Sequence, residues 1–282
     1  MIEVLKPGLY TSVQDLGRIG YRKQGVPLSG AMDSEAALLA NKLVGNLASS
    51  AVLECTMLGP TLRFMSATTF VVTGGSFKML LNASEILTHQ VVSAKQNDVL
   101  TIGTVVRGMR CYLAVEGGIH TPEILGSRSF YSSITPSEVV KKGDKLPIGT
   151  IKQNRASKNI SEVKTTPFSE EIEVYKGSEI NQLSVAQQKV LLTSHFEISP
   201  QSNRMAYLLD GQHQLSALEI ITAPVQPGTV QLTPSGKIIV LMRDAQVTGG
   251  YARIFQLTEA AINNLAQMRG GQRVRFKLSD SI

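Results

Sequence analysis

The stretch Met109-Arg110-Cys111-Tyr112-Leu113-Ala114-Val115-Glu116 alternates as a β-strand does, with apolar side chains at 109, 111, 113 and 115. Its other side chains are mixed, so we expect one face of the strand to be buried and the other to be only partly covered. Outward from it, residues 69–73 and 237–242 form further β-type runs. Because 24 glycines and 11 prolines divide the chain into short runs of this kind, the sequence predicts a mainly β protein.

Three short helices are predicted between the strands. The first begins after Asp33, a typical N-cap residue, and ends at Gly45. The second is signalled by the capping box that starts at Ser184, and the third runs from Thr258 to Gly270.

The chain divides at a polar segment, residues 149–170, which contains Pro167 and lacks apolar periodicity. We predict an exposed linker there, with domains at residues 1–148 and 171–282. The two parts share three short matches at a nearly constant offset, which indicate a duplicated β unit and hence two barrel-like units, a pseudo-duplicated fold. The matches are Ile2-Glu3-Val4 with Ile172-Glu173-Val174, Thr73-Gly74-Gly75 with Thr248-Gly249-Gly250, and Met32 with Met205.

The composition is that of a soluble globular chain. Of 282 residues, 43% are hydrophobic and 18% are charged, which excludes disorder and coiled coil. No apolar run approaches the roughly 18 residues of a membrane span, so no membrane partner is expected. The N-terminus combines Glu3 with Pro7-Gly8 and has no signal-sequence pattern, which predicts a cytoplasmic location.

The net charge, the cysteines and the histidines indicate which kinds of ligand the chain can bind. The net charge is +6, but the basic residues are scattered and lack interleaved aromatics, so we expect a small anionic substrate and no nucleic acid. Cys55 and Cys111 form no CxxC pair and are expected to be reduced core thiols. The histidines lack ligand spacing, so no metal is expected; they are His89, His120, His195 and His213.

The segment 243–251 is the first candidate site, because it follows a strongly apolar strand. Asp244, Gln246 and Thr248 share one face if the strand continues, and Gly249-Gly250 can direct backbone N–H groups toward an anion. Such donors stabilise developing oxyanion charge. The alternative interpretation of the glycines is a β-bulge or tight turn.

A second candidate lies at the start of the first helix. Ser29-Gly30-Ala31-Met32-Asp33 precedes that helix, where free N–H groups favour anions, although Asp33 is by default only the N-cap. Arg128 and Arg204 suit bidentate recognition of a carboxylate or phosphate; the alternative is a surface position or a structural ion pair.

Several motifs together resemble one family, the C subunits of 5-oxoprolinase, also called biotin-dependent carboxyltransferase or allophanate hydrolase subunit 2-like. The resemblance spans nearly the whole chain. Its motifs are Thr11-Ser12-Val13-Gln14-Asp15-Leu16-Gly17-Arg18, Gly25-Val26-Pro27-Leu28-Ser29-Gly30-Ala31-Met32-Asp33, Ala40-Asn41-Lys42-Leu43-Val44-Gly45-Asn46, Leu125-Gly126-Ser127-Arg128-Ser129 and Asp244-Ala245-Gln246-Val247-Thr248-Gly249-Gly250-Tyr251.

The resemblance implies two cyclophilin-like β-barrel units and a hydrolase complex with the 5-oxoprolinase A and B subunits, which uses ATP to open 5-oxoproline to glutamate. This chain carries neither a recognisable nucleotide motif nor a biotin attachment site. The implied catalytic residues are Asp244, Gln246 and Asp33, and the implied substrate-binding residues are Ser29, Gly30, Arg128, Arg204, Thr248, Gly249, Gly250 and Tyr251.

The chain departs from the family pattern at residues 130–136 and 204–209, where expected glycines and an arginine are missing, and at Val247, where threonine is usual. Two alternative functions therefore stay open. One is a regulatory partner of a kinase inhibitor that resembles the B subunit, and the other is a carboxyltransferase subunit of a biotin-dependent urea or amide carboxylase.

Overall fold

The structure is a computed structural model that describes residues 1–149, 168–211 and 215–279. These residues form two compact units, the first from residues 1–18 and 29–149 and the second from residues 19–28, 168–211 and 215–279. Residues 150–167 of the predicted linker lie outside the described residues. Residues 19–28 are early in the chain but belong to the second unit, an exchange that the predicted boundaries do not include.

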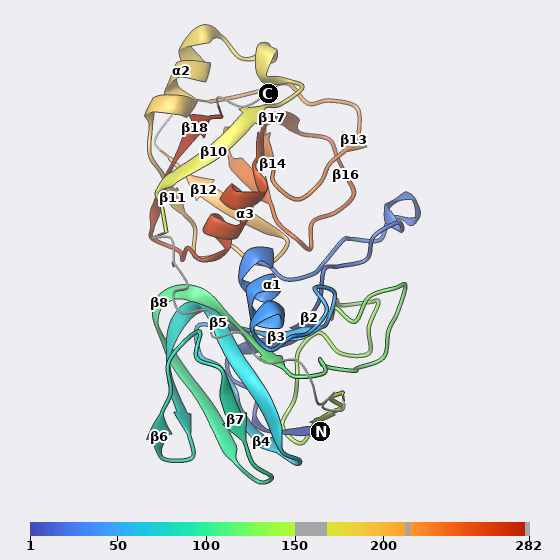
Figure 1. The fold of residues 1–282 in the computed structure, drawn as a ribbon. Helices are drawn as coiled ribbons and strands as arrows, with labels where there is room; N and C mark the ends of the chain where they lie inside the picture. The colour runs from blue at the N-terminus through green and yellow to red at the C-terminus, as the bar shows by residue number, and fades with distance from the viewer. Residues whose placement is uncertain (150–167, 212–214, 280–282) are drawn as a thin grey trace. The chain divides into compact units, whose positions relative to one another are not determined.

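The first unit is a nine-stranded sheet with one α-helix (Figure 1). Its main path has the order β2-β3-β8-β4-β1-β9, and β5 pairs with β8, β6 and β7. The elements are β1 (Ile2–Lys6), β2 (Tyr10–Gln14), α1 (Ser34–Leu43), β3 (Val52–Thr56), β4 (Thr61–Phe64), β5 (Thr68–Leu81), β6 (Ser84–Glu85), β7 (Val92–Ala94), β8 (Val99–Val115) and β9 (Lys145–Leu146).

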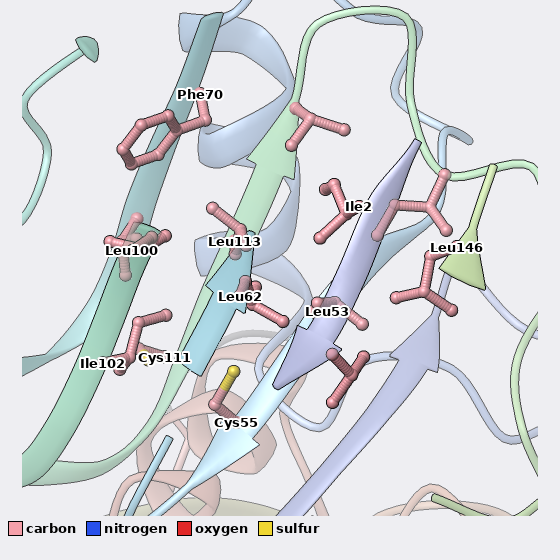
Figure 2. Close-up of a cluster of buried hydrophobic side chains, with 14 of the residues drawn as sticks. Ile2, Leu53, Cys55, Leu62, Phe70, Leu100, Ile102, Cys111, Leu113 and Leu146 are labelled. Atoms are coloured by element: carbon pink, nitrogen blue, oxygen red, sulfur yellow. The ribbon is translucent and has the colours of Figure 1, made fainter. Parts of the chain in front are cut away.

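Two long strands, β5 and β8, give this sheet its curvature. They pair antiparallel, and the register shifts three times between Gly74 and Met79. Each irregularity bends a strand and increases its twist, so the sheet curls into a half-barrel. The inner face holds the apolar core, in which Ile2, Leu53 and Phe70 cluster with Cys111 and Leu113 (Figure 2).

Along residues 110–114 of β8 the second face is buried as well, so the expectation that it would be only partly covered is wrong for Arg110, Tyr112 and Ala114. Tyr112 and Ala114 pack with Val71 of β5 and with Ala36 and Ala40 of α1 in a second apolar cluster. The helix therefore covers the outer face of the sheet. Alternation along one strand cannot reveal this, because the covering residues come from another part of the chain.

The two cysteines lie opposite each other on neighbouring strands. Cys55 of β3 is the register partner of Cys111 of β8, and both are buried free thiols, as predicted. Burial raises the pKa of Cys111 well above its ordinary value, and the neighbouring Cys55 adds to the shift. Both features favour an inert protonated thiol at Cys111.

The second unit is a closed barrel of seven strands in the order β10-β17-β14-β15-β12-β11-β18. A parallel pairing of β10 with β18 closes it, and Phe196, Phe255 and Phe276 pack in its core. The elements are η1 (Arg22–Gln24), β10 (Glu171–Lys176), η2 (Ile180–Gln182), α2 (Val185–Thr193), β11 (Phe196–Ile198), β12 (Ala206–Asp210), β13 (Ala223–Pro224), β14 (Thr229–Leu232), β15 (Ile238–Leu241), β16 (Thr248–Gly249), β17 (Ala252–Leu257), α3 (Glu259–Ala266) and β18 (Arg273–Leu278).

The predicted fold class, mainly β with a few short helices, is confirmed. All three predicted helix starts are correct, because the side chains of Asp33, Ser184 and Thr258 each accept a hydrogen bond from the backbone N–H three residues on. No helix in the described ranges is both long and apolar enough to cross a membrane.

The three internal matches differ in how well they correspond structurally. Ile2-Glu3-Val4 lies in β1 and Ile172-Glu173-Val174 in β10, each the first strand of its unit's sheet. The Thr-Gly-Gly copies lie in the long β5 and at the two-residue β16, and Met32 is buried whereas Met205 is exposed. The structural correspondence therefore rests on the first match.

Candidate functional site

The loop before α1 brings three predicted site residues together in the first unit. Asp33 caps the helix, since its Oδ1 accepts the Ala36 N–H at 3.0 Å. Ser29 is 1% exposed and has a φ of 57°, a left-handed conformation that is unusual for serine, and Gly30 follows at 90°. Ser29 Oγ is a buried polar atom that makes no hydrogen bond to any described residue.

The backbone of this loop is held by the sheet beneath it. Met32 N–H donates to Glu54 Oε2 at 2.7 Å, and Asp33 N–H donates to the Tyr112 hydroxyl at 2.8 Å. Ala31 N–H donates to the Asp15 carbonyl at 3.0 Å. These three N–H groups already have acceptors within the unit, so the anion-binding capacity expected of the helix start is smaller than its position alone suggests.

Glu54, Arg110 and Tyr112 form a buried polar cluster that the sequence analysis missed. Glu54 Oε1 lies 3.8 Å from Arg110 Nε, and both side chains are almost fully buried. Burial, with the carboxylates of Glu54 and Asp33 nearby, raises the pKa of the Tyr112 hydroxyl well above its ordinary value. The available signal was a glutamate inside the apolar run of β3.

Arg128 lies in a loop whose polar groups are largely used within the first unit. Its guanidinium donates to the Thr121 carbonyl and lies 3.5 Å from Glu123 Oε2, and its backbone N–H donates to Asp15 Oδ2 at 2.6 Å. The geometry matches the structural ion pair that was its alternative interpretation. A ligand carboxylate here would compete with Glu123, which is exposed and therefore easily displaced.

In the second unit, Arg204 and Asp244 form a bidentate ion pair. Arg204 Nε donates to Asp244 Oδ2 at 2.7 Å and Nη2 donates to Oδ1 at 3.1 Å. Their side chains are only 8% and 11% exposed, so neither charge is screened strongly by water. The structure thus joins a predicted substrate-binding arginine to a predicted catalytic carboxylate.

The neighbouring Arg243 anchors the same loop to α3. Its guanidinium pairs with Glu259 in the first turn of α3 and donates to Asn263 Oδ1 one turn later, at 3.2 Å. The neighbouring residues Arg243 and Asp244 therefore contact different partners, since Arg243 binds α3 and Asp244 binds Arg204. The loop after β15 is held by both contacts.

The glycine segment is extended and does not form a nest. Gly249 pairs with Ala223 in the β13–β16 ladder, the carbonyl of Gly250 accepts the Ile220 N–H, and neither glycine has a positive φ. A nest requires alternating hands of backbone, so the expected convergence of N–H groups does not occur here. Gly249 ends the short strand β16, and Gly250 follows it outside any strand. Gln246 and Thr248 are exposed, and Tyr251 is 39% exposed.

The predicted site residues are therefore divided between the two units. The first unit carries Ser29, Gly30, Asp33 and Arg128, and the second carries Arg204, Asp244, Gln246, Thr248, Gly249, Gly250 and Tyr251.

In the described part of the chain, no group of three or more His, Cys, Asp or Glu side chains is placed to hold a metal ion. His120 contacts the Gly117 carbonyl at 2.8 Å, and burial lowers the pKa of His89. His213 lies outside the described residues.

The sequence matches the carboxyltransferase domain family, subdomain A and B, over residues 24–278. It is 37% identical to the 5-oxoprolinase C subunit of Escherichia coli K12, over 98% of this chain and 90% of that protein. The Haemophilus influenzae protein of the same name is 31% identical over 98% of this chain and 91% of its own length. Urea amidolyase of Saccharomyces cerevisiae is 39% identical, over 55% of this chain and 9% of that protein.

Two solved structures are similar to this chain in fold. The crystal structure of TTHA0988 has a TM-score of 0.88 and 28% identity, covering 98% of this chain and 55% of the solved one. The Kluyveromyces lactis urea carboxylase structure has a TM-score of 0.87 and 29% identity, covering 98% of this chain and 27% of that one. The chain thus spans about half of the first solved protein and about a quarter of the second.

Proposed function

Because the chain belongs to the carboxyltransferase domain family, we propose that it is the C subunit of an ATP-dependent 5-oxoprolinase and works with the A and B subunits. The observation that carries this proposal is the near full-length similarity to the Escherichia coli C subunit, at 37% identity over 98% of this chain and 90% of that one.

The proposed reaction converts 5-oxoproline, ATP and water to glutamate, ADP and phosphate. A lactam amide is stabilised by resonance, so activation of its oxygen by phosphorylation makes the ring carbon accessible to water. Charge develops on oxygen in such steps, and fixed donors that face this charge lower the barrier. The complex is the enzyme, and we expect this chain to be inactive alone in the cytoplasm.

In the first unit, we assign substrate contacts to Ser29 and Gly30, and Arg128 is one of two candidate partners for the substrate carboxylate, Arg204 being the other. Ser29 Oγ supports the assignment, because a buried hydroxyl without a protein partner can donate to a small polar ligand without first breaking a bond. Asp33 has its Oδ1 on the helix start, and we assign its charge to orienting the lactam or water.

In the second unit, we assign the main role to the Arg204–Asp244 pair. Bidentate contact with Asp244 holds the guanidinium of Arg204 in one orientation, which is the preorganisation that carboxylate recognition needs. Gln246 is assigned to orienting the lactam or water. Thr248, Gly249, Gly250 and Tyr251 are assigned to substrate contact through side chains and strand backbone, not through a nest.

ATP is assigned to the complex as a whole. Each of the two predicted substrate-binding arginines is already paired with a carboxylate of its own unit, Arg128 with Glu123 and Arg204 with Asp244. A triphosphate bound by either would have to displace that carboxylate. Since this chain also carries no recognisable nucleotide motif, we assign ATP binding to the assembled complex.

The test is reconstitution. Matching A and B subunits receive 5-oxoproline and ATP with and without this chain, and glutamate and phosphate are measured. Glutamate formed only in the presence of the chain supports the proposal. A tight complex with the B subunit and no glutamate contradicts it and favours the regulatory alternative.

A second candidate, a carboxyltransferase subunit of a urea or amide carboxylase, is favoured by the likeness to Kluyveromyces lactis urea carboxylase. Its test supplies urea and a carboxylated biotin carrier protein on another chain. Transfer of the carboxyl group in that assay, without glutamate formation in the first, would establish this alternative.

A further inference from the structure

We infer that Asp15 is a positioning residue that holds two loops of the candidate site, residues 29–33 and 126–130, in register with each other. The inference rests on the proposed function, because it concerns how the first unit binds its substrate. Asp15 directly follows β2 and was not among the predicted site residues.

The Asp15 carboxylate accepts four hydrogen bonds. Oδ1 accepts the Gly17 N–H at 2.8 Å, the Ser127 hydroxyl at 2.6 Å and the Ser129 hydroxyl at 2.7 Å. Oδ2 accepts the Arg128 N–H at 2.6 Å. Three of these donors come from the 126–130 loop, so a single side chain fixes that loop and the orientation from which Arg128 extends.

The backbone of Asp15 holds the other loop. Its carbonyl accepts the Ala31 N–H at 3.0 Å, while its own N–H donates to Ser129 Oγ at 2.9 Å. Gly30 crosses directly over this turn, and a Cβ there would lie 3.0 Å from Gly17 N and 3.1 Å from the Asp15 carbonyl oxygen. Asp15 is thus hydrogen-bonded both to the loop that carries Ser29 and to the loop that carries Arg128.

A carboxylate is required here because its surroundings are donors. In Asp15→Asn, an amide group in the Oδ2 position would point N–H toward the Arg128 N–H, and in the flipped orientation it would face the Gly17 N–H and two hydroxyls. Either way at least one close donor loses its acceptor. The substitution keeps the size of the side chain, so it changes the register of the loops rather than the packing.

The test measures glutamate formation by the complex of the A and B subunits with this chain carrying Asp15→Asn. We expect KM for 5-oxoproline to rise roughly 10- to 100-fold, with a smaller change in kcat, because misplacement of binding groups by about 1 Å has effects of this size. A purely structural role would lower the amount of active enzyme and leave KM unchanged. Unchanged KM in an active complex overturns the inference.

The matched control is Asp98→Asn in the same unit, where the carboxylate accepts Asn82 Nδ2 at 2.9 Å and the Lys95 N–H at 2.8 Å. It should leave KM unchanged. If Asp15→Asn does not fold, Ser127→Ala removes one of the four donors and should raise KM in the same direction by less.

Amide exchange separates this inference from the proposed function. In the intact chain, Asp15→Asn should speed exchange at both Arg128 and Ala31, and Asp98→Asn at neither. If the wild-type complex forms no glutamate, the proposed function fails, and the exchange alone decides the role of Asp15. Unchanged exchange at Ala31 overturns the coupling of the two loops.

Discussion

The Arg204–Asp244 pair shows how a single buried contact links stability to chemistry. Removing one partner leaves an uncompensated buried charge, whereas removing both leaves none. We expect Asp244→Ala to lower the free energy of unfolding by about 3–5 kcal/mol, and Arg204→Met with Asp244→Ala to cost less than that single change. Urea unfolding measures both. A loss in the double variant that equals the sum of the Asp244→Ala and Arg204→Met losses, each measured alone, would show that the pair is not coupled.

Asp244→Asn is the matching variant for activity, because an amide oxygen still accepts one hydrogen bond from Arg204. Loss of glutamate formation in a folded Asp244→Asn complex would support the assigned role. Full activity would remove the carboxylate from the mechanism.

The pair of Glu179 with Arg253 predicts how the second unit responds to acid. A hydrogen bond from Arg253 chiefly lowers the pKa of Glu179 below its ordinary value of 4.5. The unfolded chain binds this proton first as the pH falls, so the stabilisation is present above about pH 4.5 and is lost as the pH falls through the lowered value. Glu179→Gln should flatten the fall in Tm below that pH.

The control for this experiment is Glu85→Gln, at an exposed position in β6 of the first unit. It should leave the slope of Tm against pH unchanged. An unaltered acid slope in Glu179→Gln would contradict the prediction.

For single residues, the sequence predicted local roles such as helix capping better than it predicted which distant side chain each residue contacts. The structure confirms Asp33 as the predicted cap, because its position before an apolar helix repeat is a local signal, and its role as a site residue stays a prediction. The pairing of Arg204 with Asp244 joins residues 40 positions apart, and spacing cannot reveal which of several carboxylates an arginine will contact. Glu54 and Asp15 were missed for the same reason.

Among the elements, α1 separates the two roles of Asp33. Asn caps a helix as well as Asp does, but it lacks the charge. We expect Asp33→Asn to keep the stability within a few tenths of a kcal/mol while lowering glutamate formation, and Asp33→Ala to cost about 1 kcal/mol as well. Thermal unfolding and the reconstituted assay measure the two effects. Unchanged activity in Asp33→Asn would leave Asp33 as a cap alone.

The junction of β8 with α1 gives another prediction, because the Tyr112 hydroxyl accepts the backbone N–H of Asp33. Tyr112→Phe keeps the ring in its cluster but leaves this buried donor without its acceptor. A loss of about 1–3 kcal/mol is expected in urea unfolding. Phe70→Leu, a change in the opposite core, should leave exchange at the Asp33 amide unchanged. No loss in Tyr112→Phe would mean that the bond contributes nothing.

The same junction explains where the sequence pattern was incomplete. The alternation in β8 correctly predicted a strand and one buried face, since Cys111, Leu113 and Val115 lie in the inner core. On the second face, Tyr112 and Ala114 are buried because α1 packs on them, and periodicity within one strand contains no information about a helix that lies some 70 positions earlier in the chain.

In the whole molecule, the chain changes unit after residue 18, again after residue 28, and once more between residues 149 and 168. The family motif at residues 25–33 therefore begins in the second unit and ends in the first. Composition and turn signals mark residues 149–170 as a connection but give no sign of the earlier exchange, because a ten-residue insertion has no core of its own from which its place could be predicted.

Residues 19–28 contact a part of the second unit that lies some 200 positions later in the sequence, and this contact gives a prediction. The guanidinium of Arg22 donates to the carbonyl of Val225, and the Val225 N–H in turn donates to the Val247 carbonyl beside the predicted site segment. In the intact chain, Arg22→Ala should speed amide exchange at Val225 by roughly 10- to 100-fold, because a hydrogen bond to a charged group is worth about 1.5–3 kcal/mol. Lys23→Ala, at the next and exposed position, should not. Arg22→Ala should not change amide exchange in β2 or β3, because those strands belong to the other unit. If it changed exchange in those strands and left Val225 unaffected, residues 19–28 would have to be reassigned to the first unit.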